Sequence, residues 1–455
     1  ILNDLGSPMK NYKEDKKLKR IKSQIRMKKI KFFIMPLGVI MMLVGCKTYE
    51  SNSAKETLRG TLDGYYDGKT VSASMRRYIE QWNQTEPTQN EFYSSFSYHG
   101  LKGLEYEEGI SRRDPSTIIK VDGTYYVYYT RSPKTKAPVG YLKATKFLPA
   151  NTWDMCDIYY ATSKDGKVWE EQGVAAKRGP EGEFDDRSVF TPDIMYYKGK
   201  YYLYYQAVKF PYTERSKNVI GMSWSYSPTG PWNRHPEPIL KSGKSGVFVE
   251  GSKKRAHISA YGDFDSQKVH DPNLIVRDGK IWMYYKAHPM GVQSEHEAPR
   301  GVGLKKPYPN FTMGVAIAET PEGPFIKHPL NPVSASGHEA LVWPYKEGVA
   351  TMITANGPEK NTIQWAKDGV NFKVKAHIVL PPDAAGLYCP DKYDNTTNGK
   401  GFTWGMAHIA QSKSKPWAYL IGFKCDLSQD VNDFNHKREN IRFDETSRVN
   451  STRRR

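Results

Sequence analysis

Two hydrophobic patterns divide the chain. Near the amino end, Met75, Ile79 and Trp82 recur three to four positions apart, which is the spacing of one face of a helix. Ser72 precedes them as a suitable N-cap. From residue 95 onward, short runs of Tyr, Val, Ile and Trp alternate with Gly, Asp, Asn and Pro, a pattern typical of strands and tight turns. The sequence therefore predicts a short helical segment, whose apolar face packs on its own domain or on a partner subunit, followed by an all-β domain.

A repeated unit runs through the β region. Each copy has an acidic residue, a short strand, a turn that contains glycine and a second strand, as in DPSTIIKVDGTYYVYYT and HDPNLIVRDGKIWMYYKA. Asp-Gly at 122–123 and at 278–279 is a strong hairpin signal. A second hairpin follows in at least four copies, as in YYATSKDGKVWEE. The acids that mark the five copies are Asp114, Asp193, Asp271, Glu339 and Asp391.

Two hairpins in each copy make four strands, which is one propeller blade. Five copies therefore predict a five-bladed β-propeller, with unrelated hairpins in a sandwich as the alternative. Since the innermost strands of a propeller line a central channel, we expect the five acids to converge around one cavity. Like charges that are gathered in this way cost free energy, so acid–base chemistry or a bound cation is their expected purpose.

Structural roles remain open for the same acids. Asp193 and Asp391 stand beside proline, where Asp also caps turns. Asp114 follows Arg113 and can form a structural ion pair with it. Asp271 follows His270 and also has a structural alternative.

Paired carboxylates around an aromatic-lined cavity suggest hydrolysis of a glycosidic bond, in which one group protonates the leaving oxygen and the other activates water or attacks the sugar. Because blades hold their acids apart, we favour the wider separation of about 6.5–9.5 Å that is typical of inverting enzymes. The Tyr and Trp residues could stack on a sugar ring. Runs such as YYVYY, however, are interpreted mostly as the core of the blades.

Several blocks carry a resemblance to a known family. SRRDPSTIIKVDGTYYVYYTRS, HDPNLIVRDGKIWMYYK and GPFIKHPLNPVSASGHEA resemble glycoside hydrolase family 117, over residues 72–427. That family contains the α-1,3-(3,6-anhydro)-L-galactosidases, or neoagarooligosaccharide hydrolases. The resemblance implies a five-bladed propeller and an inverting, exo-acting enzyme that removes 3,6-anhydro-L-galactose from the non-reducing end of agar-derived oligosaccharides. It also implies a homodimer in which the N-terminal helical segments are exchanged.

The resemblance also implies roles for individual residues. Asp114 matches the general base and Asp271 the second catalytic carboxylate, while His338 and Glu339 match the place of the acid. We favour His338 as the acid, because an unperturbed histidine pKa near 6.5 suits proton donation at neutral pH, and give Glu339 an orienting or sugar-binding role. On a regular strand only one of these neighbours can face the substrate. Arg113, Asp193 and Asp391 are expected to bind substrate.

Two segments, 241–267 and 288–305, depart from the family pattern and flank the Asp271 copy. If they form loops over the mouth of the cavity, the substrate could differ. The chemistry requires no cofactor. A divalent cation in the central channel is compatible with this type of propeller, but no dense His/Cys motif identifies a metal.

Charge and cysteine content exclude other classes. The net charge is +18, but much of the excess lies at the two ends of the chain, so nucleic-acid binding is not indicated. Four cysteines are too few for a disulfide scaffold.

The amino end carries an export signal. Lysines after Met27 precede the apolar run FFIMPLGVIMMLV at 32–44, which is too short to span a bilayer and fits a signal peptide. The LVGC sequence resembles a bacterial lipoprotein signal, with Cys46 as the lipidated residue. We therefore expect a protein of the cell envelope, lipid-anchored in the periplasm or at the outer membrane.

These observations predict five segments and leave two rival functions open. The segments are an upstream extension (1–26), the signal (27–46), a tether with the dimerising helix (47–90), the catalytic propeller (91–435) and a basic tail (436–455). The rivals are a propeller glycosidase for another anhydro-sugar or a pentose, and a lipid-anchored glycan-binding protein without activity.

Overall fold

A computed structural model describes residues 66, 68–80, 90–252, 257–291, 308–410, 412 and 414–430. All of them belong to the compact unit Ser53–Arg455. The predicted upstream extension, the signal with Cys46, the basic tail and Trp82 lie outside the described residues.

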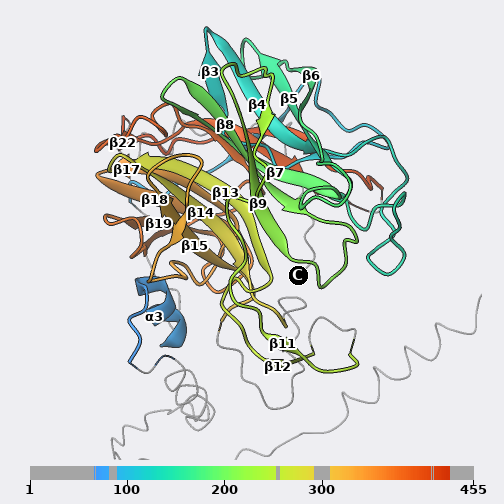
Figure 1. Cartoon of the computed structure of the whole chain (residues 1–455). Coiled ribbons are helices and arrows are strands. Elements are labelled where there is room, and N and C mark those ends of the chain that lie inside the picture. Colours follow the sequence, from blue (N-terminus) through green and yellow to red (C-terminus); the bar gives the residue numbers. More distant parts are fainter. Residues whose placement is uncertain are drawn as a thin grey trace, which may run out of the picture. The chain divides into compact units, whose positions relative to one another are not determined.

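The described residues form one short helix and a series of mostly antiparallel sheets (Figure 1). The strands of the first group are β2 (Arg112–Arg113), β3 (Ile119–Val121), β4 (Thr124–Arg131), β5 (Asp157–Ser163) and β6 (Glu170–Ala176). The next strands are β7 (Ser188–Tyr197), β8 (Lys200–Val208), β9 (Asn218–Ser225) and β10 (Asn233–Arg234). They share a sheet with β13 (Lys268–Arg277), β14 (Lys280–His288), β15 (Thr312–Ala318) and β16 (Ile326–Lys327), because β9 and β13 pair at Asn218 and Lys268.

Two further sheets complete the β region. One contains β17 (His338–Lys346), β18 (Gly348–Ala355), β19 (Thr362–Ala366), β20 (Lys373–His377) and β22 (Gly399–Lys400). The other contains β21 (Gly386–Tyr388), β23 (Trp404–Ile409), β24 (Tyr419–Lys424) and β1 (Ser97–Gly100), so an early strand pairs with the last one. A separate ribbon is formed by β11 (Val247–Phe248) and β12 (Ile258–Ala260).

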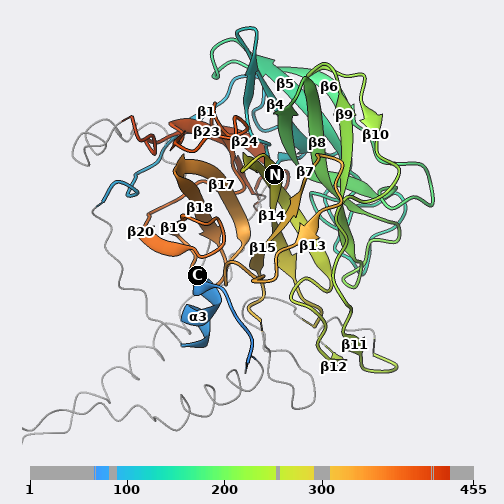
Figure 2. The same cartoon turned by 60° about the vertical axis from the view of Figure 1, so that its left-hand side comes forward.

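Successive groups place their long inner strands next to one another (Figure 2). β7 contacts both β4 and β13, and β13 contacts β17. The mostly-β prediction with a short N-terminal helix is confirmed, and the arrangement is propeller-like. The count of five blades stays a prediction.

The hairpins predicted at Asp-Gly are present. Asp122 and Gly123 have φ of 48° and 76°, and Asp278 and Gly279 have φ of 52° and 70°. Positive φ at both central positions is the geometry of a type I′ turn, whose twist matches that of the flanking strands. These local signals set the register of β3 with β4 and of β13 with β14.

The tyrosine runs fill the interior between sheets, as predicted. Tyr128, Tyr129, Tyr204 and Tyr205 are completely buried. Three of the four cysteines, Cys156, Cys389 and Cys425, are described, and all three are buried. None of the helices in the described ranges is long and apolar enough to cross a membrane.

The predicted helix is α3 (Ala73–Ile79). Ser72 is its N-cap, since its hydroxyl accepts a hydrogen bond from the backbone N–H of Met75 at 3.3 Å. Met75 is completely buried against its own chain. Exchange of this helix between subunits stays a prediction.

Candidate active site

One cavity of about 460 Å³ brings together residues that lie far apart in the sequence. Asp114, Asp271, His338 and Glu339 all line it. They come from the segment after β2, from β13 and from β17. The volume lies in the range of pockets that hold small ligands.

The backbone repeats one unusual conformation around this cavity. In each of the five repeats one left-handed residue stands at the cavity, in addition to those in the hairpin turns: Asp114 (φ 50°), Thr191 (49°), Asp271 (47°), Glu339 (56°) and Ala384 (42°). All five line the cavity. Side chains with a Cβ rarely adopt this conformation outside turns, and such strained residues cluster at functional sites.

The positions of these left-handed residues correct the prediction that the five acids occupy equivalent positions in the repeats. Thr191, two positions before Asp193, is the counterpart of Asp114, and Ala384 takes that position in the last repeat. The cause is a bulge: the pairing shifts between Phe190 and Asp193 in β7, as it does between His270 and Asn273 in β13. The alternating pattern of a regular strand does not predict where a bulge falls, so the sequence could not show which residue takes this position.

Asp114 is buried and is held by a guanidinium, an imidazole and a hydroxyl. Nε of Arg113 lies 2.8 Å from its Oδ2, and Nδ1 of His408 lies 3.2 Å from its Oδ1. Thr130 donates to Oδ2 at 3.3 Å. Burial alone raises the pKa of the Asp114 carboxyl, but the positive charge of Arg113 and the hydrogen bond with His408 outweigh it and hold the pKa far below its ordinary value. Asp114 is therefore a carboxylate throughout the working range of an enzyme.

Asp271 forms an ion pair with Lys286. The two atoms, Asp271 Oδ2 and Lys286 Nζ, lie 2.5 Å apart, and both residues line the cavity. Lys286 comes from β14, where it pairs opposite His270. Burial, followed by the charges of Lys286 and Lys268, lowers the pKa of His270 well below 6.5, so His270 is neutral.

His338 is held on three sides. Its Nδ1 is hydrogen-bonded to Oδ1 of Asn356, and its ring stacks on Phe311 with centroids 4.6 Å apart. Its Nε2 faces Oε1 of Glu339 at 3.7 Å. Burial, and then the charge of Lys286, lowers the pKa of His338 below 6.5 although Glu339 opposes this effect. The expectation of an unperturbed histidine is therefore wrong.

Both His338 and Glu339 line the cavity, because the strand is not regular at this point. The left-handed conformation of Glu339 breaks the alternation of side chains at this point.

Asp193 lies at the cavity but its carboxylate serves the fold. Oδ1 accepts the N–H of Thr117 at 3.0 Å, and Oδ2 accepts the N–H of Leu274 at 2.9 Å. Nζ of Lys392, a fully buried residue, lies 3.3 Å from Oδ2 and also donates to Oδ1 of Asn273 at 3.0 Å. Asp193 therefore ties three other repeats to its own, which is the structural role left open for it in the sequence.

Asp391 is not among the residues that line the cavity, and its contact with substrate stays a prediction. Its Oδ2 accepts the backbone N–H of Lys400 at 2.8 Å, and its Oδ1 accepts a contact from the thiol of Cys389. Its carboxylate therefore stabilises a turn, which is the structural role that the sequence left open for an Asp beside proline.

The predicted divalent cation finds no ligand cluster among the described residues. In that part of the chain, no group of three or more His, Cys, Asp or Glu side chains is arranged to hold a metal ion. The ammonium of Lys392 supplies a buried positive charge among the oxygens of Asp193, Asn273 and Thr117 instead. A cation in the channel stays a prediction.

Three aromatic side chains, Tyr141, Trp153 and Tyr212, form an aromatic wall of the cavity. The sequence analysis did not single them out. Tyr141 and Trp153 come from the segment between β4 and β5, and Tyr212 follows β8. Trp153 Nε1 donates to the hydroxyl of Tyr212 at 3.1 Å. Arg113 lies over the Trp153 ring, 4.7 Å from its centroid. Arg113, predicted to bind substrate, thus contacts both Asp114 and this wall.

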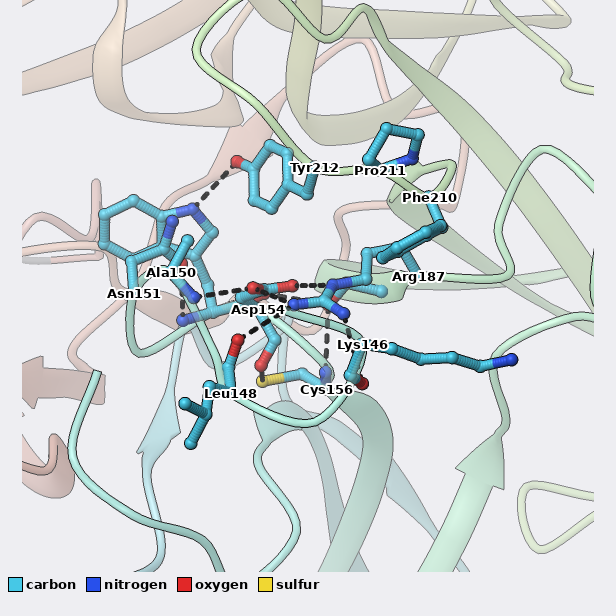
Figure 3. A network of polar contacts seen from close by, with 12 residues as sticks. Lys146, Leu148, Ala150, Asn151, Asp154, Cys156, Arg187, Phe210, Pro211 and Tyr212 are labelled. Atoms are coloured by element: carbon cyan, nitrogen blue, oxygen red, sulfur yellow. Dashed lines mark hydrogen bonds and ion pairs between the residues drawn. The ribbon is translucent and has the colours of Figure 1, made fainter. Parts of the chain in front are cut away.

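A buried ion pair fixes the segment that carries Trp153 (Figure 3). Nε of Arg187 lies 2.6 Å from Oδ1 of Asp154, and its NH2 lies 2.7 Å from Oδ2. NH1 of Arg187 also donates to the carbonyl of Thr145 at 2.8 Å. Such bidentate pairing gives a defined geometry. No residue pattern along the chain revealed these contacts, because Asp154 and Thr145 lie in the segment before β5 and Arg187 lies in the segment before β7.

The segment 241–267, expected as a loop over the mouth, forms the β11–β12 ribbon. None of its described residues lines the cavity. Lys268 and His288, at the borders of the two divergent segments, do line it.

A solved structure resembles this chain closely. Zg3597, a family 117 glycoside hydrolase produced by the marine bacterium Zobellia galactanivorans, is 40% identical over 76% of this chain and 94% of its own, with a TM-score of 0.64. The chain belongs to glycoside hydrolase family 117. The resemblance inferred from the sequence blocks is thereby confirmed.

Two more distant matches also support the conclusion that this family 117 chain is a glycoside hydrolase. The model of glycosyl hydrolases family 43 matches residues 110–248, which include Asp114 and Asp193. The extracellular endo-alpha-(1->5)-L-arabinanase 2 of Bacillus subtilis (strain 168) is 24% identical over 187 residues, 40% of this chain. This alignment spans only 34% of that relative.

Proposed function

We propose that this chain is an exo-acting, inverting hydrolase that releases 3,6-anhydro-L-galactose from the non-reducing end of neoagarooligosaccharides. The observation that carries the proposal is the convergence of Asp114, Asp271 and His338 on one cavity. The sugar itself is inferred from the family resemblance of the sequence blocks that hold these residues.

In the proposed reaction, Asp114 takes a proton from a water molecule that attacks the anomeric carbon. Its depressed pKa keeps it ionised at the working pH, and it also makes Asp114 a weak base. As the glycosidic bond breaks, protonated His338 gives its Nε2 proton to the leaving oxygen and becomes a neutral imidazole. The proton taken up by Asp114 then returns to His338 through solvent, so the net reaction consumes one water. Asp271, held by Lys286, faces the positive charge that develops on the sugar ring.

The hydrogen bonds of His338 support its role as the acid. An acceptor oxygen of Asn356 at Nδ1 leaves Nε2 as the nitrogen that gains and loses a proton. Glu339 faces that nitrogen and favours the protonated form electrostatically. We therefore assign proton donation to His338 and orientation to Glu339.

A second candidate is a glycosidase that removes a pentose. The match of the family 43 model to residues 110–248 and the likeness to an arabinanase favour it. Both candidates use the same cavity, so only the product distinguishes them.

The deciding experiment incubates the purified protein with neoagarobiose, and separately with aryl α-L-arabinofuranoside and aryl β-D-xyloside, and identifies the monosaccharide. Release of 3,6-anhydro-L-galactose from neoagarobiose alone is expected. Proton NMR of the first product should show an inverted anomeric configuration. Release of pentose alone overturns the assignment in favour of the second candidate, while oligosaccharide binding without any release favours a glycan-binding protein.

A further inference from the structure

Helix α3 lies outside the cavity, yet it contacts the segments that hold His338. The link is Glu359, which is buried with 2% of its side chain exposed. Ser74 of α3 donates to Oε2 of Glu359 at 2.5 Å, and Arg77 of α3 donates to Oε1 at 2.8 Å through Nε. A buried carboxylate requires this kind of compensation, so the charge of Glu359 depends on Arg77.

The first route from Glu359 to His338 runs through the turn that joins β18 and β19. Glu359 lies in this turn, and its backbone N–H donates to the hydroxyl of Ser336 at 2.8 Å. Asn356, at the other end of the turn, is hydrogen-bonded to Nδ1 of His338. The position of this turn therefore determines where the partner of the imidazole lies.

The second route runs through the segment before β17. Ser72 donates to the carbonyl of Pro332 at 2.7 Å, and the hydroxyl of Ser74 accepts the N–H of Ala335 at 2.7 Å. His338 is only three residues beyond Ala335.

The two routes meet in tightly packed backbone. Gly357 has φ of 88°, and a Cβ at this position would lie 2.3 Å from the hydroxyl of Ser336. A Cβ on Gly337 would lie 2.3 Å from the carbonyl of Thr312. The turn and the segment before β17 are therefore packed so closely that a shift of either one displaces the other, and His338 with it.

We propose that Ser74, Arg77 and Glu359 form a clamp through which α3 positions the imidazole of His338 for proton transfer. The proposal deepens the proposed function and rests on it for the role of His338. The three residues are positioning residues, since none of them lines the cavity.

The test compares Arg77→Met, Ser74→Ala and the rescue variant Arg77→Lys with wild type in the full-length chain. Arg76→Met is the matched control, because Arg76 is the neighbouring arginine of α3 and its side chain is exposed. Since misplacing a catalytic group by about 1 Å can cost about 10²-fold, we expect Arg77→Met to lower kcat at least about tenfold with KM within about twofold. Ser74→Ala, a milder change, should lower kcat in the same direction, Arg77→Lys should restore most of it, and Arg76→Met should match wild type.

A second readout follows His338 itself. The charged and titratable groups that face its ring are Glu339, Lys286, Asp271 and His270. NMR titration of the imidazole, assigned with His338→Gln, is expected to give a lower pKa in Arg77→Met, because a displaced Asn356 no longer supports the protonated ring.

The two readouts separate the outcomes. A lower melting temperature in Arg77→Met and Ser74→Ala, with kcat and the His338 titration unchanged, would mean that the cluster only docks α3, and the proposal would fall. If wild type hydrolyses no sugar, the proposed function fails instead, and the titration by itself still decides whether the clamp holds the imidazole.

Discussion

Nε2 of His338 and Oε1 of Glu339 lie 3.7 Å apart, although the two residues are neighbours in one strand. Neighbours on a regular strand point to opposite faces. The left-handed backbone of Glu339, with φ of 56°, turns both side chains to the same cavity. An acid candidate and the carboxylate that favours its protonation are thus supplied by two consecutive residues.

Asp114→Asn tests the general base. The amide keeps the shape of the side chain but cannot accept a proton, so we expect turnover to fall by about 10²–10⁴-fold while oligosaccharide binding persists. Steady-state kinetics and calorimetric binding measure the two effects. Asp122→Asn is the control, because Asn suits the left-handed position of the β3–β4 turn and should leave turnover unchanged. Near-normal turnover in Asp114→Asn would remove Asp114 from the mechanism.

His338→Gln and Glu339→Gln distinguish the acid from its neighbour. Loss of the acid matters most when the leaving group is a poor one, such as a sugar alcohol, and little when it is an acidic phenol. We therefore expect His338→Gln to lose about 10²–10⁴-fold in kcat on the natural oligosaccharide but far less on an activated aryl glycoside. Glu339→Gln should lose similar amounts on both substrates. The reverse pattern would make Glu339 the acid.

The pH dependence of kcat/KM tests how the charges around His338 affect its pKa. Burial and the charge of Lys286 lower the pKa of His338 below 6.5, so the protonated acid is lost as the pH rises through this lowered value, and kcat/KM should fall on the alkaline side. Lys286→Met removes the repelling charge and should move that limb to higher pH. Lys280→Met, at the exposed end of the same strand, is the control. An alkaline limb that does not move in Lys286→Met would show that another group sets it.

Lys392→Met tests the buried ammonium that joins three repeats. The change leaves the Asp193 carboxylate buried without its cation, which typically costs about 3–5 kcal/mol in the free energy of unfolding. Denaturant unfolding measures it, with the exposed Lys400→Met as the control. The double variant Lys392→Met with Asp193→Asn should recover part of the loss, because both charges are then absent. A single variant as stable as wild type would mean that Lys392 adds nothing to the fold.

The sequence alone determined what depends on neighbours along the chain. The Asp122–Gly123 and Asp278–Gly279 hairpins, the N-cap at Ser72 and the buried tyrosine runs followed from turn chemistry and periodicity, which act over a few residues. The motif blocks around Asp114 and Asp271 also identified the family and two acids of the cavity.

The tertiary structure decided which side chains meet. The bulge in β7 placed Thr191 where the repeat predicted Asp193, and Asp391 was left in a turn away from the cavity. His408 became a partner of Asp114 through a strand far along the chain, whereas Lys286 reaches Asp271 across the predicted β13–β14 hairpin. These relations depend on packing between distant strands and on single left-handed residues, and neither leaves a periodic signal in the chain.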